Sequence, residues 1–276
     1  MRDRGLICAA AFLRALSTGA VGVLLGIYLT RIGLPPSQVG LVIAAGLGGA
    51  AAATCLVMLL SHRIGRKRCL LAMALLSGTG GLAVALFSHP LLLGAGAFVG
   101  MINGMGRDRG GSLVLEQAIL PATVADVRRT RAFAWYNVLQ DAGHALGGLL
   151  AALPVLLRDA GVGGELESLR ITLGVCACLC LATAPLYWAL SASVEVAKDE
   201  RRMRVSPECR RILVRISSLF AVDSLAGGFL TTAFLALYFH ERFGAGAQTL
   251  GSLFIGARTR GSVRGAFPKV KGAAAV

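Results

Sequence analysis

The chain has 276 residues, of which 55% are hydrophobic and 15% are charged, and its formal net charge is +14. Soluble domains average about 25% charged residues, and the apolar excess here falls in uncharged runs as long as the ~20 helical residues that cross a bilayer. This composition excludes an ordinary soluble enzyme, a disordered chain and a nucleic-acid-binding domain.

Long apolar runs predict seven membrane-spanning helices. In chain order they cover residues 6–28, 36–61, 69–88, 91–120, 132–157, 171–194 and 213–239. Helices are required because lipid offers the backbone no hydrogen-bond partners. Glycines within the spans, such as Gly143 and Gly147, allow helix backbones to approach closely. We therefore expect an all-α membrane protein.

The fourth span is longer than a bilayer requires. We favour one helix over residues 91–120, which places Arg107, Asp108 and Arg109 near the middle of the membrane. The alternative is a helix that ends near Gly106, with residues 107–120 forming a second helix on the inner surface, because the glycines in this region can break a helix.

Basic residues are divided unequally between the two sides of the membrane. If the N-terminus is inside, the inner segments 1–5, 62–68, 121–131 and 193–212 hold 15 arginines and lysines, and the outer segments hold 4. Since basic loops remain in the cytoplasm, this predicts a cytoplasmic N-terminus. We expect a multi-pass protein of the cell membrane, in a bacterium the inner membrane.

A polar segment divides the chain. It predicts a six-helix bundle over residues 1–192, a cytoplasmic linker over 193–212, and the start of a second bundle over 213–257, with helix seven and part of an eighth. The sequence around Tyr28 is similar to that around Tyr238. Internal repeats of this kind are typical of transporter folds, although two apolar helices can resemble each other by chance.

The last residues depart from the membrane pattern. Apolar character stops at Ala257, and residues 258–276 form an atypical tail with five basic and no acidic residues. We expect that this tail is read in a shifted frame. The chain would then be truncated and would lack the rest of its second bundle.

The loop between the second and third spans carries a basic motif, Ser-His-Arg-Ile-Gly-Arg-Lys-Arg over residues 61–68, whose glycine permits a tight helix end. It resembles the signature of the major facilitator superfamily, G-x-L-x-D-R-x-G-R-K/R. The matching residues are Leu60, Arg63, Gly65, Arg66 and Lys67, whereas Met58 and His62 replace the family's glycine and aspartate. The resemblance covers about residues 1–257 and implies helix bundles that transport a solute by alternating access.

Ionisable residues inside the spans are the candidate functional residues. Those that we place near the middle of the membrane are Arg14, Arg107, Asp108, Arg109, Asp141, His144 and Asp223. Such groups cost at least ~2.5–3.5 kcal/mol each in lipid and usually face a cavity or a partner. We therefore expect one shared polar cavity, and the family resemblance implies the same.

The residue types suggest separate roles within that cavity. Arg107 and Arg109 suit a carboxylate or a phosphate, whereas Asp141, His144 and Asp223 suit proton carriage. The alternative is that the arginines and aspartates only neutralise each other as structural ion pairs. The candidate residues of the inner gate and its loop are Leu60, His62, Arg63, Gly65, Arg66, Lys67 and Glu116.

These features predict a secondary active transporter for a small solute, anionic or amphiphilic, with protons as the coupling ion. The alternative is a truncated chain that transports nothing. A seven-helix receptor is disfavoured because such receptors place the N-terminus outside, whereas the N-terminus of this chain is predicted to lie inside. No nucleotide loop, metal-ligand spacing or nucleophile–base pair is present, so we expect no enzyme activity, cofactor or nucleic-acid partner. Trp135 and Tyr136 are interpreted as membrane-interface anchors.

Overall fold

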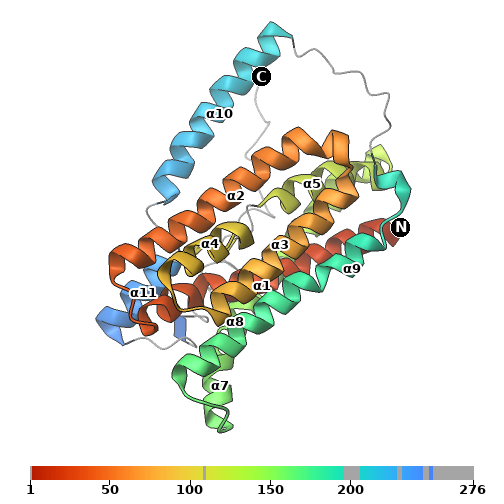
Figure 1. The fold of residues 1–276 in the computed structure, drawn as a ribbon. Coiled ribbons are helices and arrows are strands. Elements are labelled where there is room, and N and C mark those ends of the chain that lie inside the picture. Colours follow the sequence, from red (N-terminus) through yellow and green to blue (C-terminus); the bar gives the residue numbers. More distant parts are fainter. Residues whose placement is uncertain (1, 108–109, 196–205, 229–231, 245–248, 251–276) are drawn as a thin grey trace, which may run out of the picture.

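The computed structural model describes residues 2–107, 110–195, 206–228, 232–244 and 249–250 (Figure 1). Within these residues it contains helices and no β-strand, which confirms the predicted all-α class. The α-helices are α1 (Arg2–Arg31), α2 (Pro36–Ile64), α3 (Arg66–Leu86), α4 (Pro90–Gly100), α5 (Gly111–Ile119), α6 (Arg129–Leu150), α7 (Leu153–Asp159), α8 (Glu165–Leu181), α9 (Thr183–Trp188), α10 (Pro207–Gly228) and α11 (Thr232–Phe243). Three 3-10 turns cover Leu120–Thr123, Asp126–Arg128 and Ala192–Val194.

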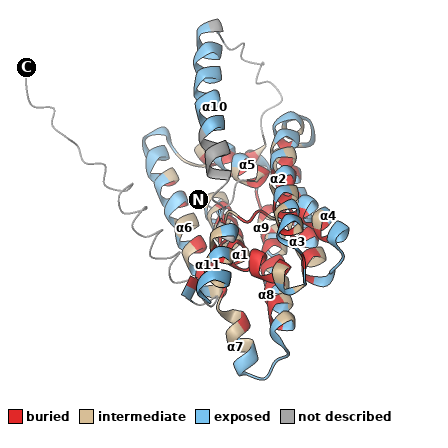
Figure 2. Ribbon diagram, turned by 90° about the vertical axis from the view of Figure 1, so that its left-hand side faces the viewer, coloured by how far each residue is buried: buried red, intermediate tan, exposed pale blue. Residues whose placement is uncertain are grey.

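Five helical segments of the described chain are long and apolar enough to cross a membrane. They are Arg2–Arg31, Pro36–Ile64, Arg66–Leu86, Asp126–Asp159 and Glu165–Trp188, and the shorter apolar α4 accompanies them. Their outer faces expose large apolar side chains, such as Leu41, Met58 and Leu91 (Figure 2). In a membrane protein these faces contact lipid, which explains why apolar side chains point outward.

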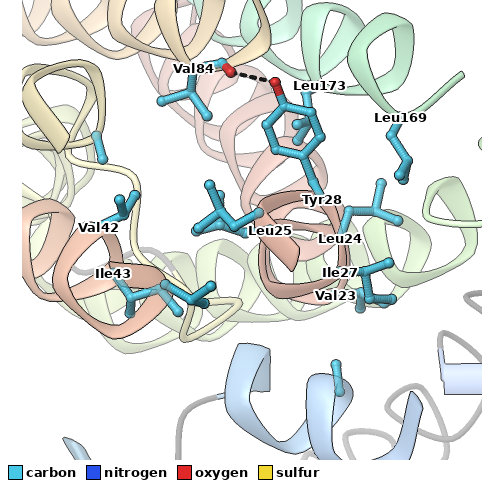
Figure 3. Close-up of a cluster of buried hydrophobic side chains, with 14 of the residues drawn as sticks. Val23, Leu24, Leu25, Ile27, Tyr28, Val42, Ile43, Val84, Leu169 and Leu173 are labelled. Carbon is cyan, nitrogen blue, oxygen red and sulfur yellow. Dashed lines mark hydrogen bonds between the residues drawn. The ribbon is translucent and has the colours of Figure 1, made fainter. Parts of the chain in front are cut away.

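Helix α1 occupies the centre of the bundle, packed against α6, α8, α9 and α11. Its second half is apolar on all sides, as expected for a helix surrounded by other helices. Tyr28 lies in this half, is fully buried, and donates a hydrogen bond of 2.8 Å to the carbonyl oxygen of Val84 in α3 (Figure 3). The bond satisfies the one polar atom that this side chain brings into the core.

Glycines allow α1 and α6 to approach closely, as the sequence predicts. A Cβ atom added to Gly143 would lie 2.8 Å from the Cβ of Ala15, and one added to Gly19 would lie 2.5 Å from the carbonyl oxygen of His144. Both distances are too short for real contacts. The two helices therefore pack backbone to backbone, an arrangement that lipid-embedded helices favour.

The prediction of one long fourth helix is wrong. Helix α4 ends at Gly100, and Met101 follows in the left-handed conformation with φ 54°. The described residues that follow, 101–107, have irregular backbone, and a Cβ on Gly22 or Gly46 would collide with Gly106 or Ile102 of this segment. Irregular backbone at membrane depth is tolerated where protein buries it. These contacts with α1 and α2 provide that burial.

The predicted seventh span covers residues 213–239. It falls on α10 and α11, with residues 229–231 between them outside the described part. Side chains 208–222 of α10 are exposed, and this helix stands apart from the bundle (Figures 1 and 2). Helix α10 begins at Pro207, within the predicted linker, because proline fits the first turn of a helix. The predicted eighth span and the basic tail lie almost wholly outside the described residues.

Candidate functional site

A buried ion pair joins α1 to α5. The Nη1 and Nη2 atoms of Arg14 donate to the Oε1 and Oε2 atoms of Glu116 at 2.9 and 2.6 Å. The side chains are 7% and 0% exposed. A two-pronged contact of this kind is the strongest geometry for an arginine and a carboxylate. It compensates two charges that burial would otherwise make costly.

Two tyrosines complete the coordination of the carboxylate. Tyr187 of α9 donates to Oε1 of Glu116 and Tyr136 of α6 donates to Oε2, each at 2.6 Å. The Arg14 guanidinium also donates to the Tyr187 hydroxyl, and Gln140 donates to the Tyr136 hydroxyl at 3.3 Å. Each carboxylate oxygen therefore accepts two hydrogen bonds. We call Arg14, Glu116, Tyr136 and Tyr187 the buried network; it connects α1, α5, α6 and α9.

A small cavity of about 60 Å³ adjoins the buried network, and its lining is mostly apolar with a polar edge. It lies between α1, α3, α8 and the irregular segment that follows α4, and Arg14 forms part of its wall. The other polar side chains in its lining include Ser17, Thr18, Ser77, Asn103 and Ser112. Apolar side chains make up most of the rest of the lining, so a water molecule would bind at this polar edge, next to the ion pair.

A histidine extends the polar contacts along the α1–α6 interface. The Nδ1 atom of His144 lies 3.2 Å from the Thr18 hydroxyl, which donates to the carbonyl oxygen of Arg14 at 3.0 Å. Because the hydroxyl proton is used there, the Thr18 oxygen is free to accept from His144, which favours a proton on Nδ1. His144 is buried, at 6% exposed.

The structure brings together only some of the predicted cavity residues. Arg14 and His144 lie on facing sides of the α1–α6 interface, and Asp141 is half-buried one turn from His144. Arg107 lies in the irregular segment after α4 and is exposed, rather than inside a long helix. Three residues remain: Asp108 and Arg109 lie outside the described residues, and the Asp223 side chain is not described although α10 includes its backbone.

The basic loop is held at the start of α3. Gly65 joins α2 to α3 with φ 101°, a conformation that favours glycine. The Glu195 carboxylate accepts hydrogen bonds from the backbone N–H groups of Arg66 and Lys67, at 2.6 and 3.1 Å. A carboxylate at a helix N-terminus is favoured by the helix dipole. The segment after α9 thereby supplies a carboxylate to the start of α3.

Other loop residues have different surroundings. The Lys67 ammonium donates to the carbonyl oxygen of Leu190 at 2.8 Å and lies 5.6 Å from the centre of the Trp188 ring. His62 and Arg63 are exposed, and Leu60 is half-buried. Glu116, predicted as a gate residue near the inner mouth, is instead enclosed by the buried network.

Sequence reasoning missed the tyrosines and Glu195. The interpretation of Tyr136 as an interface anchor is wrong, because its side chain is fully buried, whereas the neighbouring Trp135 is exposed. The sequence could have indicated this, because Tyr136 and Gly143 lie on the same uncharged face of α6. Since Gly143 makes the close contact with α1, that face, and Tyr136 with it, points toward α1. For Glu195, the indication in the sequence was that His62 stands where the family motif has an aspartate. The motif is therefore left without a carboxylate of its own.

Comparison with known proteins gives one family. The sequence model described as Major Facilitator Superfamily matches residues 7–263. An uncharacterized membrane protein of Saccharomyces cerevisiae is 25% identical over 289 residues, which cover 92% of this chain and 64% of that protein.

Solved transporter structures share the fold. A D-xylose-proton symporter superposes with a TM-score of 0.63 at 16% identity, covering 94% of this chain and 66% of that one. A bacterial homologue of the human drug peptide transporters gives a TM-score of 0.58 at 14% identity, covering 93% and 51%. The chain thus spans about half to two thirds of the length of these relatives.

Proposed function

We propose that this chain, which belongs to the Major Facilitator Superfamily, acts in the proton-coupled transport of a small solute across a membrane by alternating access. The supporting observation is the buried network, in which one carboxylate carries four hydrogen bonds from three helices beside a small cavity that Arg14 helps to line. The fold is shared with proteins that include a D-xylose-proton symporter. The proposal applies to the whole carrier, because the chain spans only part of its relatives' length.

In the proposed mechanism Glu116 binds the transported proton. As a carboxylate it attracts Arg14 and accepts both tyrosine hydroxyls. Protonation removes its charge, so the ion pair and the charge-assisted hydrogen bonds weaken together. Since α1, α5, α6 and α9 meet at this carboxylate, its charge state sets how tightly these helices are held. Arg14 is then available to bind an anionic or amphiphilic solute.

His144 is the proposed second proton carrier. It lies on α6, and the Thr18 hydroxyl connects it to the backbone of Arg14. An imidazole can take up or release a proton at a ring nitrogen, which is the chemistry proposed for His144. We retain Asp141 and Arg107 as proposed contributors to the aqueous path. Gly65, Arg66 and Lys67 are proposed to hold the inner ends of α2 and α3.

The test measures proton movement driven by a solute. The purified whole carrier is reconstituted in liposomes that contain a pH-sensitive dye, and D-xylose, dialanine and succinate are added in turn. We expect one solute class to change the internal pH, and Glu116→Gln to abolish that change. Glu208→Gln, on the exposed side of α10, is the matched control. The proposal is wrong if no solute class moves protons, or if Glu116→Gln moves them at the normal rate.

A further inference from the structure

A second, larger cavity lies at the end of the bundle that holds the N-terminus. Its volume is about 470 Å³, and it is lined by the first turns of α1 and the start of α6. These two helices pack side by side (Figure 2). We call it the arginine groove. Its lining consists of Arg4, Gly5, Cys8, Arg128, Arg131, Ala132, Trp135 and Leu139. None of these residues belongs to the buried network.

The arginine groove concentrates positive charge. Among the described residues, Arg4, Arg128 and Arg131 form no ion pair, whereas the neighbouring Arg129 pairs with Asp126 at 2.8 Å. The groove also adjoins the N-terminus of α6, where the helix dipole is positive and the first turn contains no acidic residue. Water screens the exposed Arg128 and Arg131, and an anion bound among the three arginines would lower their mutual repulsion further.

The acidic residue closest to Arg4 in sequence is engaged elsewhere. The carboxylate of Asp3 accepts hydrogen bonds from the backbone N–H and the hydroxyl of Ser191, at the far side of α1. It therefore does not neutralise the groove. A bound ligand with negative charge would balance the three guanidinium groups.

The deeper part of the arginine groove is apolar. Trp135 and Leu139 follow Arg131 at intervals of one helical turn, and Val138 lies beside them. Trp135 and Val138 are 56% and 52% exposed. An exposed tryptophan just inside a row of arginines is typical of the membrane–water boundary. The groove is thus cationic at the water side and apolar at the lipid side, which fits an amphiphile.

We propose that the arginine groove binds an anionic phospholipid. The phosphate lies among Arg4, Arg128 and Arg131, and an acyl chain lies along Trp135 and Leu139. Guanidinium groups match phosphate oxygens in pairs, and each basic residue adds to attraction by an anionic membrane surface. A lipid in this position holds the inner end of α1 to α6. The binding does not depend on transport or on the buried network.

The experiment uses tryptophan fluorescence, because the chain has only two tryptophans. Trp188→Phe leaves Trp135 as the only reporter, and this variant is reconstituted in phosphatidylcholine vesicles. Phosphatidylglycerol with brominated acyl chains is then added at increasing mole fraction to quench the fluorescence. We expect brominated phosphatidylglycerol to quench Trp135 at a much lower mole fraction than brominated phosphatidylcholine. Arg131→Gln should raise the required fraction about fivefold.

Arg129→Gln is the matched control. It removes the same charge from the same turn, but Arg129 is paired with Asp126 and does not line the groove. We expect it to leave the quenching curve unchanged. Equal quenching by both lipids, or equal effects of Arg129→Gln and Arg131→Gln, would overturn the proposal. Displacement of the lipid by millimolar inorganic phosphate would also overturn it, because the site would then recognise a free anion.

A second readout needs no change to the groove. Cys8 is a free thiol in its lining. Alkylation of Cys8 by a water-soluble maleimide, measured by peptide mass spectrometry, should be slower in phosphatidylglycerol vesicles than in phosphatidylcholine vesicles. Cys209, exposed on α10, reports any general effect of the lipid on the reagent. Equal labelling of Cys8 in both lipids, with Cys209 unaffected, would contradict occupation of the groove.

Discussion

Arg14 and Glu116 are 102 positions apart in the sequence, yet each terminal nitrogen of the arginine donates a hydrogen bond to one oxygen of the carboxylate. Both side chains are buried. The pair joins the central helix α1 to α5, which follows the break after α4. It is therefore a junction for the bundle as well as the proposed proton site.

Removing one member of the pair should destabilise the protein strongly. We expect Arg14→Met to lower the free energy of unfolding by about 3–5 kcal/mol, because it leaves Glu116 buried without its cation. Arg14→Met combined with Glu116→Leu should recover much of that loss. Unfolding in mixed micelles with increasing sodium dodecyl sulfate measures the values. Arg31→Met, which breaks the exposed pair with Glu165, should cost at most about 1 kcal/mol.

The tyrosine hydroxyls should contribute individually. Hydrogen bonds to charged groups are worth about 1.5–3 kcal/mol, so Tyr136→Phe and Tyr187→Phe should each lower stability by about that amount. Tyr238→Phe is the control, because Tyr238 is exposed. The same micelle unfolding assay applies. If the two buried tyrosines behave like Tyr238, their hydroxyls do not hold Glu116 in the way described.

Glycine packing between α1 and α6 predicts a steric effect. Gly143→Ala should destabilise the protein by about 1–3 kcal/mol, because the added methyl group meets Ala15 and the backbone of α1. Gly174→Ala in α8 is the matched control, since nothing lies within 4 Å of its added Cβ. That substitution should be neutral or stabilise by up to about 1 kcal/mol, as alanine favours helices. A similar loss for both variants would refute the close contact.

Loss of the Glu195 carboxylate should loosen the start of α3. Glu195→Ala removes both acceptors of the Arg66 and Lys67 N–H groups. We expect faster hydrogen exchange at these two amides, because their hydrogen bonds to a carboxylate are lost. The first amides of α6 serve as an internal reference and should keep their rates. Unchanged exchange at Arg66 and Lys67 would show that Glu195 does not cap the helix in solution.

The sequence predicted the first three helices well because each is a long apolar run, interrupted only by Arg14 in the first, with a clear polar boundary. It failed at the fourth, since the break depends on contacts with Gly22 and Gly46, which are distant in sequence. That error also affected the site. A continuous helix would carry Glu116 toward the inner mouth, whereas the break returns α5 to the interior beside Arg14.

Arg14 could be recognised as unusual because it interrupts an apolar run, but its partner could not. Three arginines and several acids were available for pairing, and the sequence gives no distances between helices. Tyr136 was misassigned because a tyrosine beside a tryptophan near a helix end usually marks the membrane boundary. Which of the two side chains is buried depends on how α6 is rotated about its own axis relative to α1. In the structure this rotation buries Tyr136 and exposes Trp135.

Infrared difference spectroscopy of Glu116 tests the central claim most directly. Spectra of the purified protein are recorded with and without the solute that moves protons, over a range of pH, and compared with those of Glu116→Gln. We predict a protonated-carboxyl band that appears with the solute and is missing from the variant. A spectrum in which this band is absent, or persists unchanged in Glu116→Gln, would contradict proton binding by the partner of Arg14.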